Sequence, residues 1–216
     1  MTEKFLEELG DLKKDVNNMS LTAMEMLECG VKSMKEQDME LARVVIARRN
    51  EIADMDQIVE EKALRIMSLY QPMGKDVRLI ACTLKMNTYL ARVGRYGNDI
   101  AKMTVENEDQ PHVCKMVSLP YMSRVVCSMI EDATKGFEFG ELPPLDSFRD
   151  REDEVDALRY SIFRECLNYM LEDPRKITRC IRYIMTARYL ERCGDYACKI
   201  AEKVHYVATG EHVEIK

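Results

Sequence analysis

Apolar residues recur along this chain at spacings of three and four, which is the pattern of a helix with one buried face. Ile177, Ile181 and Ile184 show this spacing near the carboxyl end. Gly and Pro, which interrupt helices, gather in short segments such as 71–74 and 139–144. Only 9 Gly and 6 Pro occur among 216 residues, too few for a turn-rich β protein. The pattern therefore predicts an all-α fold of long helices.

The interruptions divide the chain into six predicted helices. Asp38 is a good N-cap for the second helix, Thr2 is a candidate N-cap for the first, and Pro120 suits the first turn of the fourth. Gly94 and Gly97 fall inside a helix and predict close packing against a neighbour. A linker is expected at 107–111. The predicted helices cover residues 1–35, 38–70, 75–106, 121–135, 146–171 and 174–208.

The two halves of the chain carry an internal repeat. Residues 89–101 read YLARVGRYGNDIA and residues 189–201 read YLERCGDYACKIA, with seven of thirteen positions identical at an offset of 100. Chance would give about one identity. The repeat predicts duplication of a unit of about 100 residues, each copy a three-helix bundle. We expect the first repeat to span residues 1–108 and the second 109–216.

Composition narrows the functional classes. The net charge is −6 with a pI of about 5.3, so a direct nucleic-acid partner is not expected. No apolar run approaches the roughly 20 residues that span a bilayer, and the first residues lack the apolar core of a signal peptide. The sequence predicts a cytoplasmic protein. Eight Cys are scattered without a CxxC pair, which favours buried packing over zinc binding.

Two acidic pairs in the second half are the main candidate for chemistry. Glu152 and Asp156 stand four residues apart on the fifth predicted helix, and Glu191 and Asp195 stand four apart on the sixth. A spacing of four puts both side chains of a pair on one helix face. Counted from the turn at 172–173, the two pairs are level to within roughly 3 Å at 1.5 Å per residue. An antiparallel hairpin would therefore place four carboxylates side by side.

Four adjacent carboxylates repel one another and need compensation. A cation with oxygen ligands would supply it, and such a site suits magnesium, calcium, manganese or oxidised iron. Alternatively, Arg159, Arg192 and Lys199 neutralise a solvated face. A ferritin-like di-metal site needs two Glu-x-x-His motifs, and the chain has one, at 202–205. Phosphate-binding loops and a Ser-His-Asp arrangement have no support, so the chain is not expected to be an enzyme.

Several segments resemble one known family. Residues 190–197 read LERCGDYA and resemble the LERxGDxA signature of PhoU proteins. Residues 169–175 read YMLEDPR, similar to the YMMEDPR turn of that family, and 71–78 read QPMGKDVR, similar to its QPxxxDLR turn. The resemblance covers essentially the whole chain. It implies two tandem three-helix bundles related by approximate two-fold symmetry.

The resemblance also implies a metal site. PhoU proteins carry E/DxxxD motifs that bind iron or zinc, and these motifs match Glu152 with Asp156 and Glu191 with Asp195. In the first half we place Met55 and Val59, and Ala91 and Arg95, at the equivalent positions. No carboxylate occurs there, so we expect a single metal site, in the second repeat. Acidic residues near that position are expected to pair with Arg95.

Regulation is the function that the resemblance implies. PhoU proteins restrain phosphate uptake and phosphate-starvation gene expression. They act with the phosphate ABC transporter, whose ATPase is a candidate partner here, and with a phosphate-sensing kinase. This chain would then bind protein partners, reach the membrane only through them, and form a homodimer. The alternative is a PhoU-like metal-binding domain that serves another transporter or has a metal-storage or metal-enzyme role.

Overall fold

The computed structural model describes residues 2–106 and 111–215, and these residues contain no β-strand. The predicted linker at 107–111 lies outside the described residues except for Pro111. None of the described helices combines the length and apolarity that crossing a membrane requires. The elements are α1 (Glu3–Glu36), α2 (Met39–Ala47), α3 (Arg49–Tyr70), α4 (Lys75–Val105), α5 (Ser118–Phe139), α6 (Leu145–Glu172), the 3₁₀ helix η1 (Pro174–Lys176) and α7 (Ile177–Thr209).

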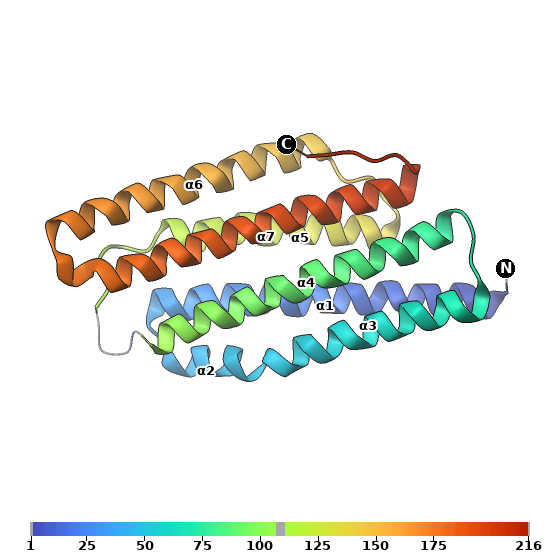
Figure 1. Cartoon of the computed structure of the whole chain (residues 1–216), viewed down its shortest axis with the longest axis horizontal. Helices are drawn as coiled ribbons and strands as arrows, with labels where there is room; N and C mark the ends of the chain where they lie inside the picture. The colour runs from blue at the N-terminus through green and yellow to red at the C-terminus, as the bar shows by residue number, and fades with distance from the viewer. Residues whose placement is uncertain (1, 107–110, 216) are drawn as a thin grey trace.

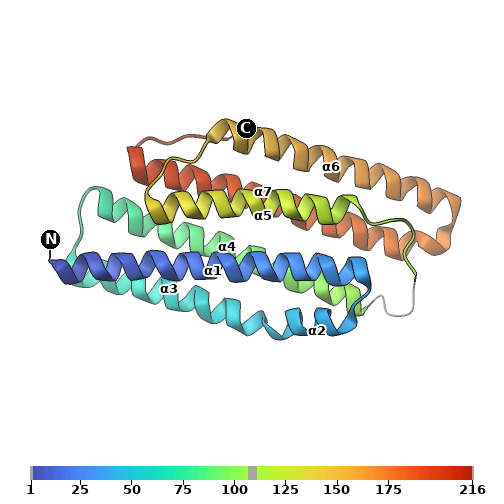
Figure 2. The same cartoon turned by 180° about the vertical axis from the view of Figure 1, so that it is seen from behind.

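The helices form two bundles that lie side by side with nearly parallel long axes (Figures 1 and 2). One bundle contains α1, α2 with α3, and α4, and the other contains α5, α6 and α7. They join where α1 packs on α5 and α4 packs on α7. Buried apolar residues form one continuous core through both. The predicted all-α class, with two tandem three-helix bundles, is confirmed.

Local chemistry sets several helix ends as predicted. The Asp38 carboxylate accepts a hydrogen bond from the backbone N–H of Leu41 at 2.9 Å, so it caps α2. Pro120 lies in the first turn of α5. Thr2 stands at the N-cap position of α1 but makes no side-chain capping bond. In the turn before α7, Asp173 accepts from the backbone N–H of Arg175 at 3.0 Å, which orders the start of the last helix.

The predicted single helix at 38–70 is wrong, because it breaks at Arg48 into α2 and α3. No Pro or Gly marks the break. Tertiary contacts stabilise it instead. The Asn98 amide, from α4, donates to the carbonyl of Ile46 at 3.1 Å. The Arg48 guanidinium contacts Glu25 of α1 and Glu51 of α3, each at 2.7 Å.

The two bundles meet in a reciprocal stack of tyrosines. Tyr89 of α4 stacks on Tyr196 of α7 with ring centroids 5.4 Å apart, and Tyr96 stacks on Tyr189 at 4.7 Å. In the sequence repeat, Tyr89 matches Tyr189 and Tyr96 matches Tyr196. Replacing each tyrosine of one stacked pair by its repeat counterpart therefore gives the other stacked pair, as a local two-fold axis between α4 and α7 requires.

Close helix packing at Gly97 is confirmed. A Cβ atom on Gly97 would lie 2.5 Å from the backbone carbon and oxygen of Met26 in α1. One on Gly30 would meet the carbonyl oxygen of Gly97 at 2.5 Å. Only glycine allows α1 and α4 to approach this closely. The equivalent position of the second repeat is Ala197, so the two bundles differ in how tightly their helices pack.

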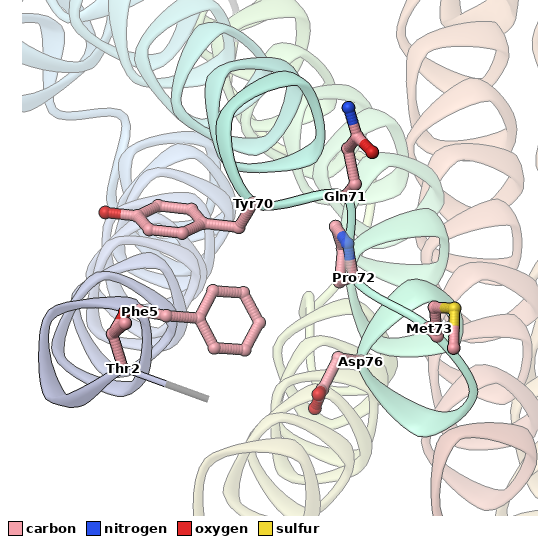
Figure 3. A pocket seen from close by; sticks show the side chains of 7 residues that line it. All are labelled: Thr2, Phe5, Tyr70, Gln71, Pro72, Met73 and Asp76. Atoms are coloured by element: carbon pink, nitrogen blue, oxygen red, sulfur yellow. The ribbon is translucent and has the colours of Figure 1, made fainter.

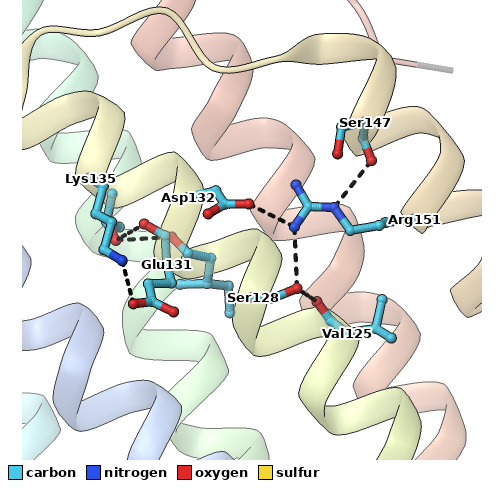
Figure 4. Close-up of polar contacts among 9 residues, drawn as sticks. Val125, Ser128, Glu131, Asp132, Lys135, Ser147 and Arg151 are labelled. Atoms are coloured by element: carbon cyan, nitrogen blue, oxygen red, sulfur yellow. Dashed lines mark hydrogen bonds and ion pairs between the residues drawn. The ribbon is translucent and has the colours of Figure 1, made fainter.

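Arg151 fixes the start of α6 against α5 (Figure 4). Its guanidinium donates to the Asp132 carboxylate at 2.8 Å and to Ser128 Oγ at 3.2 Å, both on α5. Its Nε donates to the carbonyl of Ser147, one turn earlier on α6, at 3.1 Å. Because Arg151 directly precedes Glu152, these bonds also fix where the first predicted acidic pair begins.

Candidate functional site

The α6–α7 hairpin brings the two predicted acidic pairs together. Glu152 and Asp156 lie on α6, and Glu191 and Asp195 lie on α7. Nε of Arg159 stands 3.8 Å from a carboxylate oxygen of Asp156 and 3.8 Å from one of Glu191, so a single guanidinium joins the two helices. We call the four acidic residues the carboxylate corner.

Three arginines neutralise much of this corner. Arg188 forms an ion pair with Glu191, and Arg192 forms one with Asp195 at 3.1 Å. Arg159 bridges the helices as described. Lys199 instead binds Glu202, at 3.1 Å. Sequence reasoning considered Arg159 and Arg192 but missed Arg188, although its position three residues before Glu191 is a helical ion-pair spacing.

Burial and mutual repulsion disfavour the charged forms of three corner carboxylates. Burial raises the pKa of Glu191, and the charges of Asp195 and Asp156 raise it further, against the guanidinium groups of Arg188 and Arg159. Burial likewise raises the pKa of Asp195. The pKa of Glu152 is raised by burial and then by Asp156 and Asp195. The arginines therefore compensate the corner incompletely, and additional positive charge would stabilise it.

Two buried polar atoms at the corner have no hydrogen-bond partner. They are Oε2 of Glu191 and Nε of Arg159. At 3.8 Å the Arg159 contacts are ion pairs too long to be hydrogen bonds. Leaving such groups unpaired costs about 1–3 kcal/mol each. Arg159 is thus a loosely fitted counterion, and the open oxygen of Glu191 is an available ligand atom.

The corner suits a cation in the kind and number of its donors, but not yet in their spacing. Carboxylate oxygens are the ligands that hard cations prefer. However, no group of three His, Cys, Asp or Glu residues in the described parts of the chain is close enough, as the side chains stand, to hold a metal ion. Closing the four carboxylates around an ion requires Arg159 to turn away from Asp156 and Glu191.

The packing of the two repeats corrects the equivalence that the sequence suggested. Gly94 faces Ile52 and Gly194 faces Val155, so α3 and α6 align at an offset of 103 rather than 97. The buried residues repeat this offset, with Val59 matching Ile162. Met55 and Val59 are therefore not the counterparts of the α6 carboxylates, because the sequence comparison did not account for turns of different length.

The true counterparts of the α6 carboxylates are Arg49 and Ala53. Together with Ala91 and Arg95 on α4, they leave the first repeat without a carboxylate at any of the four positions. The expected ion pair of Arg95 is present, because its guanidinium lies 3.7 Å from Asp56. The prediction of a single candidate site is unchanged, although it now depends on Arg49 and Ala53 instead of Met55 and Val59.

A hollow of about 390 Å³ opens beside the carboxylate corner. Glu152 and Asp195 form its acidic side, and Tyr89 and Tyr196 of the tyrosine stack form another side. Ile215 of the C-terminal segment closes it, held by a bond from its backbone N–H to Glu202 at 3.1 Å. Sequence reasoning missed this hollow, because it depends on contacts between α4, α7 and the chain end.

The single Glu-x-x-His motif does not act as a ligand pair. Glu202 accepts bonds from Lys199 and from the backbone of Ile215. The His205 ring lies against the carbonyl of Glu211 at 3.3 Å and the hydroxyl of Thr209 at 3.3 Å. The two side chains have separate partners, so the described residues give no support to a ferritin-like centre.

Another hollow, of about 510 Å³, lies at the α3–α4 turn near the amino end (Figure 3). Phe5 and Tyr70 face it with their rings 5.2 Å apart, and Met73 and Asp76 stand on the opposite side. Its walls are mainly apolar, and among the described residues that line it Asp76 is the one acidic residue. This hollow therefore has no cation-binding character and lies apart from the carboxylate corner.

Fold and site together define a class: all-helical proteins built from two similar three-helix bundles, with an acidic corner on the last hairpin. The chain belongs to the PhoU domain family, which matches residues 16–104 and 119–204, once in each repeat. The repeat boundary predicted at 108–109 falls between the two matches and outside the described residues.

Relatives of known sequence and structure agree with this assignment. A protein of Rhizobium meliloti named phosphate-specific transport system accessory protein PhoU homolog is 32% identical, over 95% of this chain and 87% of its own length. One of the same name from Clostridium acetobutylicum is 31% identical, over 100% of this chain and 99% of its own. The crystal structure of PhoU from Pseudomonas aeruginosa superposes with a TM-score of 0.90 at 28% identity, covering 96% of this chain and all of that one.

Proposed function

We propose that this protein regulates phosphate uptake and the phosphate-starvation response by binding other proteins. The observation that carries the proposal is the match of both repeats to one family whose curated relatives are named accessory proteins of phosphate-specific transport. Its partners are the ATPase of the phosphate ABC transporter, a phosphate-sensing kinase, or both. The protein acts in the cytoplasm as a non-catalytic homodimer of two-repeat subunits, divided at residues 1–108 and 109–216, and reaches the membrane through its partners.

Metal binding at the carboxylate corner is the second part of the proposal. Glu152, Asp156, Glu191 and Asp195 would hold the ion, and iron or zinc is the expected occupant from the family. The raised pKa values of three of these residues and the unpaired oxygen of Glu191 support it. A bound cation would supply the missing positive charge, and the side chains around it would become rigid. That change would alter the surface presented to a partner.

Genetic complementation tests the regulatory role. In a strain lacking this protein, we expect phosphate uptake and a phosphate-starvation reporter to remain high in phosphate-rich medium. The wild-type chain should restore repression, and a pull-down from native membranes should recover the transporter ATPase or the kinase. Unchanged reporter activity, with no transport or kinase subunit recovered under any phosphate condition, would refute the regulatory role.

Metal analysis of the purified protein tests whether the carboxylate corner binds a metal ion. We expect the Glu191→Ala, Asp195→Ala double variant to lose most of the metal that the wild-type chain carries after loading with iron or zinc. A matched control is Asp54→Ala with Glu60→Ala, which removes two acidic residues from α3 of the first repeat. Equal metal content in all three proteins would show that Glu191 and Asp195 do not bind the metal.

A further inference from the structure

A hollow of about 350 Å³ lies where the last turns of α1 meet the first turns of α5. These two helices lie side by side at the front of Figure 2, on the opposite side of the molecule from α4 and α7, which are at the front of Figure 1. The volume is in the range of small-molecule sites. Because three basic side chains line it, Lys32, Lys35 and Arg124, we call it the basic hollow.

The three basic side chains of the hollow have no acidic partner. Lys32, Lys35 and Arg124 are exposed, and none of them forms an ion pair with another described residue. Two acidic side chains, Glu28 and Glu36, also line the hollow. Each stands four residues from Lys32, a spacing that allows a helical ion pair, but neither is paired with it. The lining therefore has a net charge of +1, and the N–H donors of its three cations are available to an anion.

A buried hydroxyl group lines the same hollow. Ser123 is 2% exposed, and among the described residues its Oγ has no hydrogen bond to nitrogen or oxygen. The sulfur of Cys127, a weak acceptor, lies beside it. Leaving a buried hydroxyl without a strong partner costs stability. A ligand oxygen in the hollow that accepts from Ser123 would remove this cost.

The duplicated position shows that the fold can satisfy a buried serine here. Every buried residue of α1 from 19 to 34 has a buried counterpart on α5 at an offset of 103. At this offset Ser123 matches Ser20, and Val31, which lines the hollow, matches Thr134. The Ser20 hydroxyl donates to the carbonyl of Asn17 at 2.8 Å and lies 3.4 Å from the Thr134 hydroxyl. Beside Ser123 the second hydroxyl is replaced by the apolar Val31, so the two related positions differ in polar satisfaction.

The unpaired cations are likewise confined to one of the two related positions. At the same offset of 103, the counterparts of the three basic residues, in chain order, are Lys135, Glu138 and Leu21. Of these only Lys135 is basic, and it forms an ion pair with Glu131 at 2.6 Å. Packing of α1 against α5 therefore does not require three unpaired cations around a buried hydroxyl. Their presence at one position alone points to a ligand.

We propose that the basic hollow binds a phosphate group, either inorganic phosphate or the phosphate of a small-molecule ester. A phosphate monoester carries roughly −1.5 to −2 charges at pH 7, and its oxygens accept hydrogen bonds from ammonium, guanidinium and hydroxyl groups. Lys32, Lys35 and Arg124 would supply the positive charge, and Ser123 would donate from the buried side. Pro120 places the hollow at the N-terminus of α5, where the helix dipole also favours an anion. The site goes beyond the proposed regulatory role and does not depend on the metal or on a protein partner.

Calorimetric titration of the metal-free protein at low ionic strength tests the site. The probes are inorganic phosphate and ribose 5-phosphate, and tighter binding of one of them identifies the source of the phosphate group. We expect Lys32→Gln with Arg124→Gln to raise Kd about tenfold, because both side chains are exposed and their loss leaves the core intact. The matched control, Lys135→Gln at the position related to Lys32, should bind as wild type does. Acetate binding as tight as that of phosphate would overturn the phosphate assignment.

Two serine variants separate ligand binding from folding. Ser123→Ala should raise the Kd for the phosphate probe, whereas its denaturant midpoint without ligand should not fall, because the lost hydroxyl had no strong partner. Ser20→Ala should do the reverse, lowering the midpoint and leaving Kd unchanged, because it removes a hydrogen bond of the fold. No saturable binding of either probe by the wild-type chain would overturn the site. Wild-type affinity in both Ser123→Ala and the Lys32, Arg124 double variant would do so too, and either result would leave the regulatory proposal standing.

Discussion

The two repeats share a fold but place opposite charges at the same corner. On α3 the residue that matches Arg159 is Asp56, and on α4 the residue that matches Asp195 is Arg95. In the first repeat these two form an ion pair at 3.7 Å, and Asp56 also accepts a hydrogen bond from the Asn87 amide at 2.7 Å. In the second repeat four carboxylates face three arginines and leave Oε2 of Glu191 unpaired. Duplication has thus kept the spacing of the buried residues, while one copy neutralises its corner and the other keeps a surplus of negative charge.

The difference shows which parts of each bundle are structural. Buried residues of α3 and α6 keep the same spacing, and the tyrosines of α4 and α7 keep a reciprocal stack. Charges at the corner are not kept. Features that both copies share are therefore attributable to folding. The carboxylate corner, which the second copy alone has, is a candidate for function.

The largest expected effect concerns helix packing in the first repeat. Gly97→Ala should destabilise the protein by about 3 kcal/mol, because the new methyl group meets the backbone of Met26 at 2.5 Å and a helix must shift. The reverse change at the matched position, Ala197→Gly, should cost only about 1 kcal/mol of helix propensity. Denaturant unfolding measures both. Equal costs would show that the two bundles pack alike.

A smaller effect is expected from the bridging arginine. Arg159→Gln removes the positive charge shared by Asp156 and Glu191, so a cation no longer competes with it. We expect metal affinity to rise about tenfold, equivalent to roughly 1.4 kcal/mol. Asp56→Asn, its counterpart in the first repeat, should leave affinity unchanged. Calorimetric titration with zinc measures both variants, and weaker binding by Arg159→Gln would contradict a competing counterion.

The smallest effect is the pH dependence of stability in metal-free protein. Because burial and neighbouring acids raise the folded-state pKa values of Glu191 and Asp195, the folded chain holds protons that the unfolded chain has released. The contribution of these groups is fully present below the ordinary carboxyl pKa, about 4, and is lost as pH rises through the raised values. Glu191→Gln with Asp195→Asn should flatten this decline in the unfolding free energy as the pH rises above the ordinary carboxyl pKa. If the decline is the same in the double variant, other titrating groups cause it.

Periodicity and turn residues were enough to predict the helices, the duplication and the level acidic pairs, because each depends on local spacing. The break at Arg48 was not predictable, since it depends on Asn98 and Glu25 from other helices. The repeat register at the corner was missed for a related reason: turns of different length shift α3 against α6, and only Gly94 and Gly194 with their neighbours reveal the shift. Local sequence therefore predicts the helices better than it predicts the tertiary contacts between them.

Anomalous X-ray diffraction from crystals loaded with zinc or iron tests the difference between the two corners most directly. We predict a metal peak among the carboxylates of Glu191, Asp195, Glu152 and Asp156, with Arg159 turned away. The first-repeat corner should show no peak and should retain its ion pair between Asp56 and Arg95. A loaded crystal with Arg159 still between Asp156 and Glu191, and no metal peak beside it, would contradict the account.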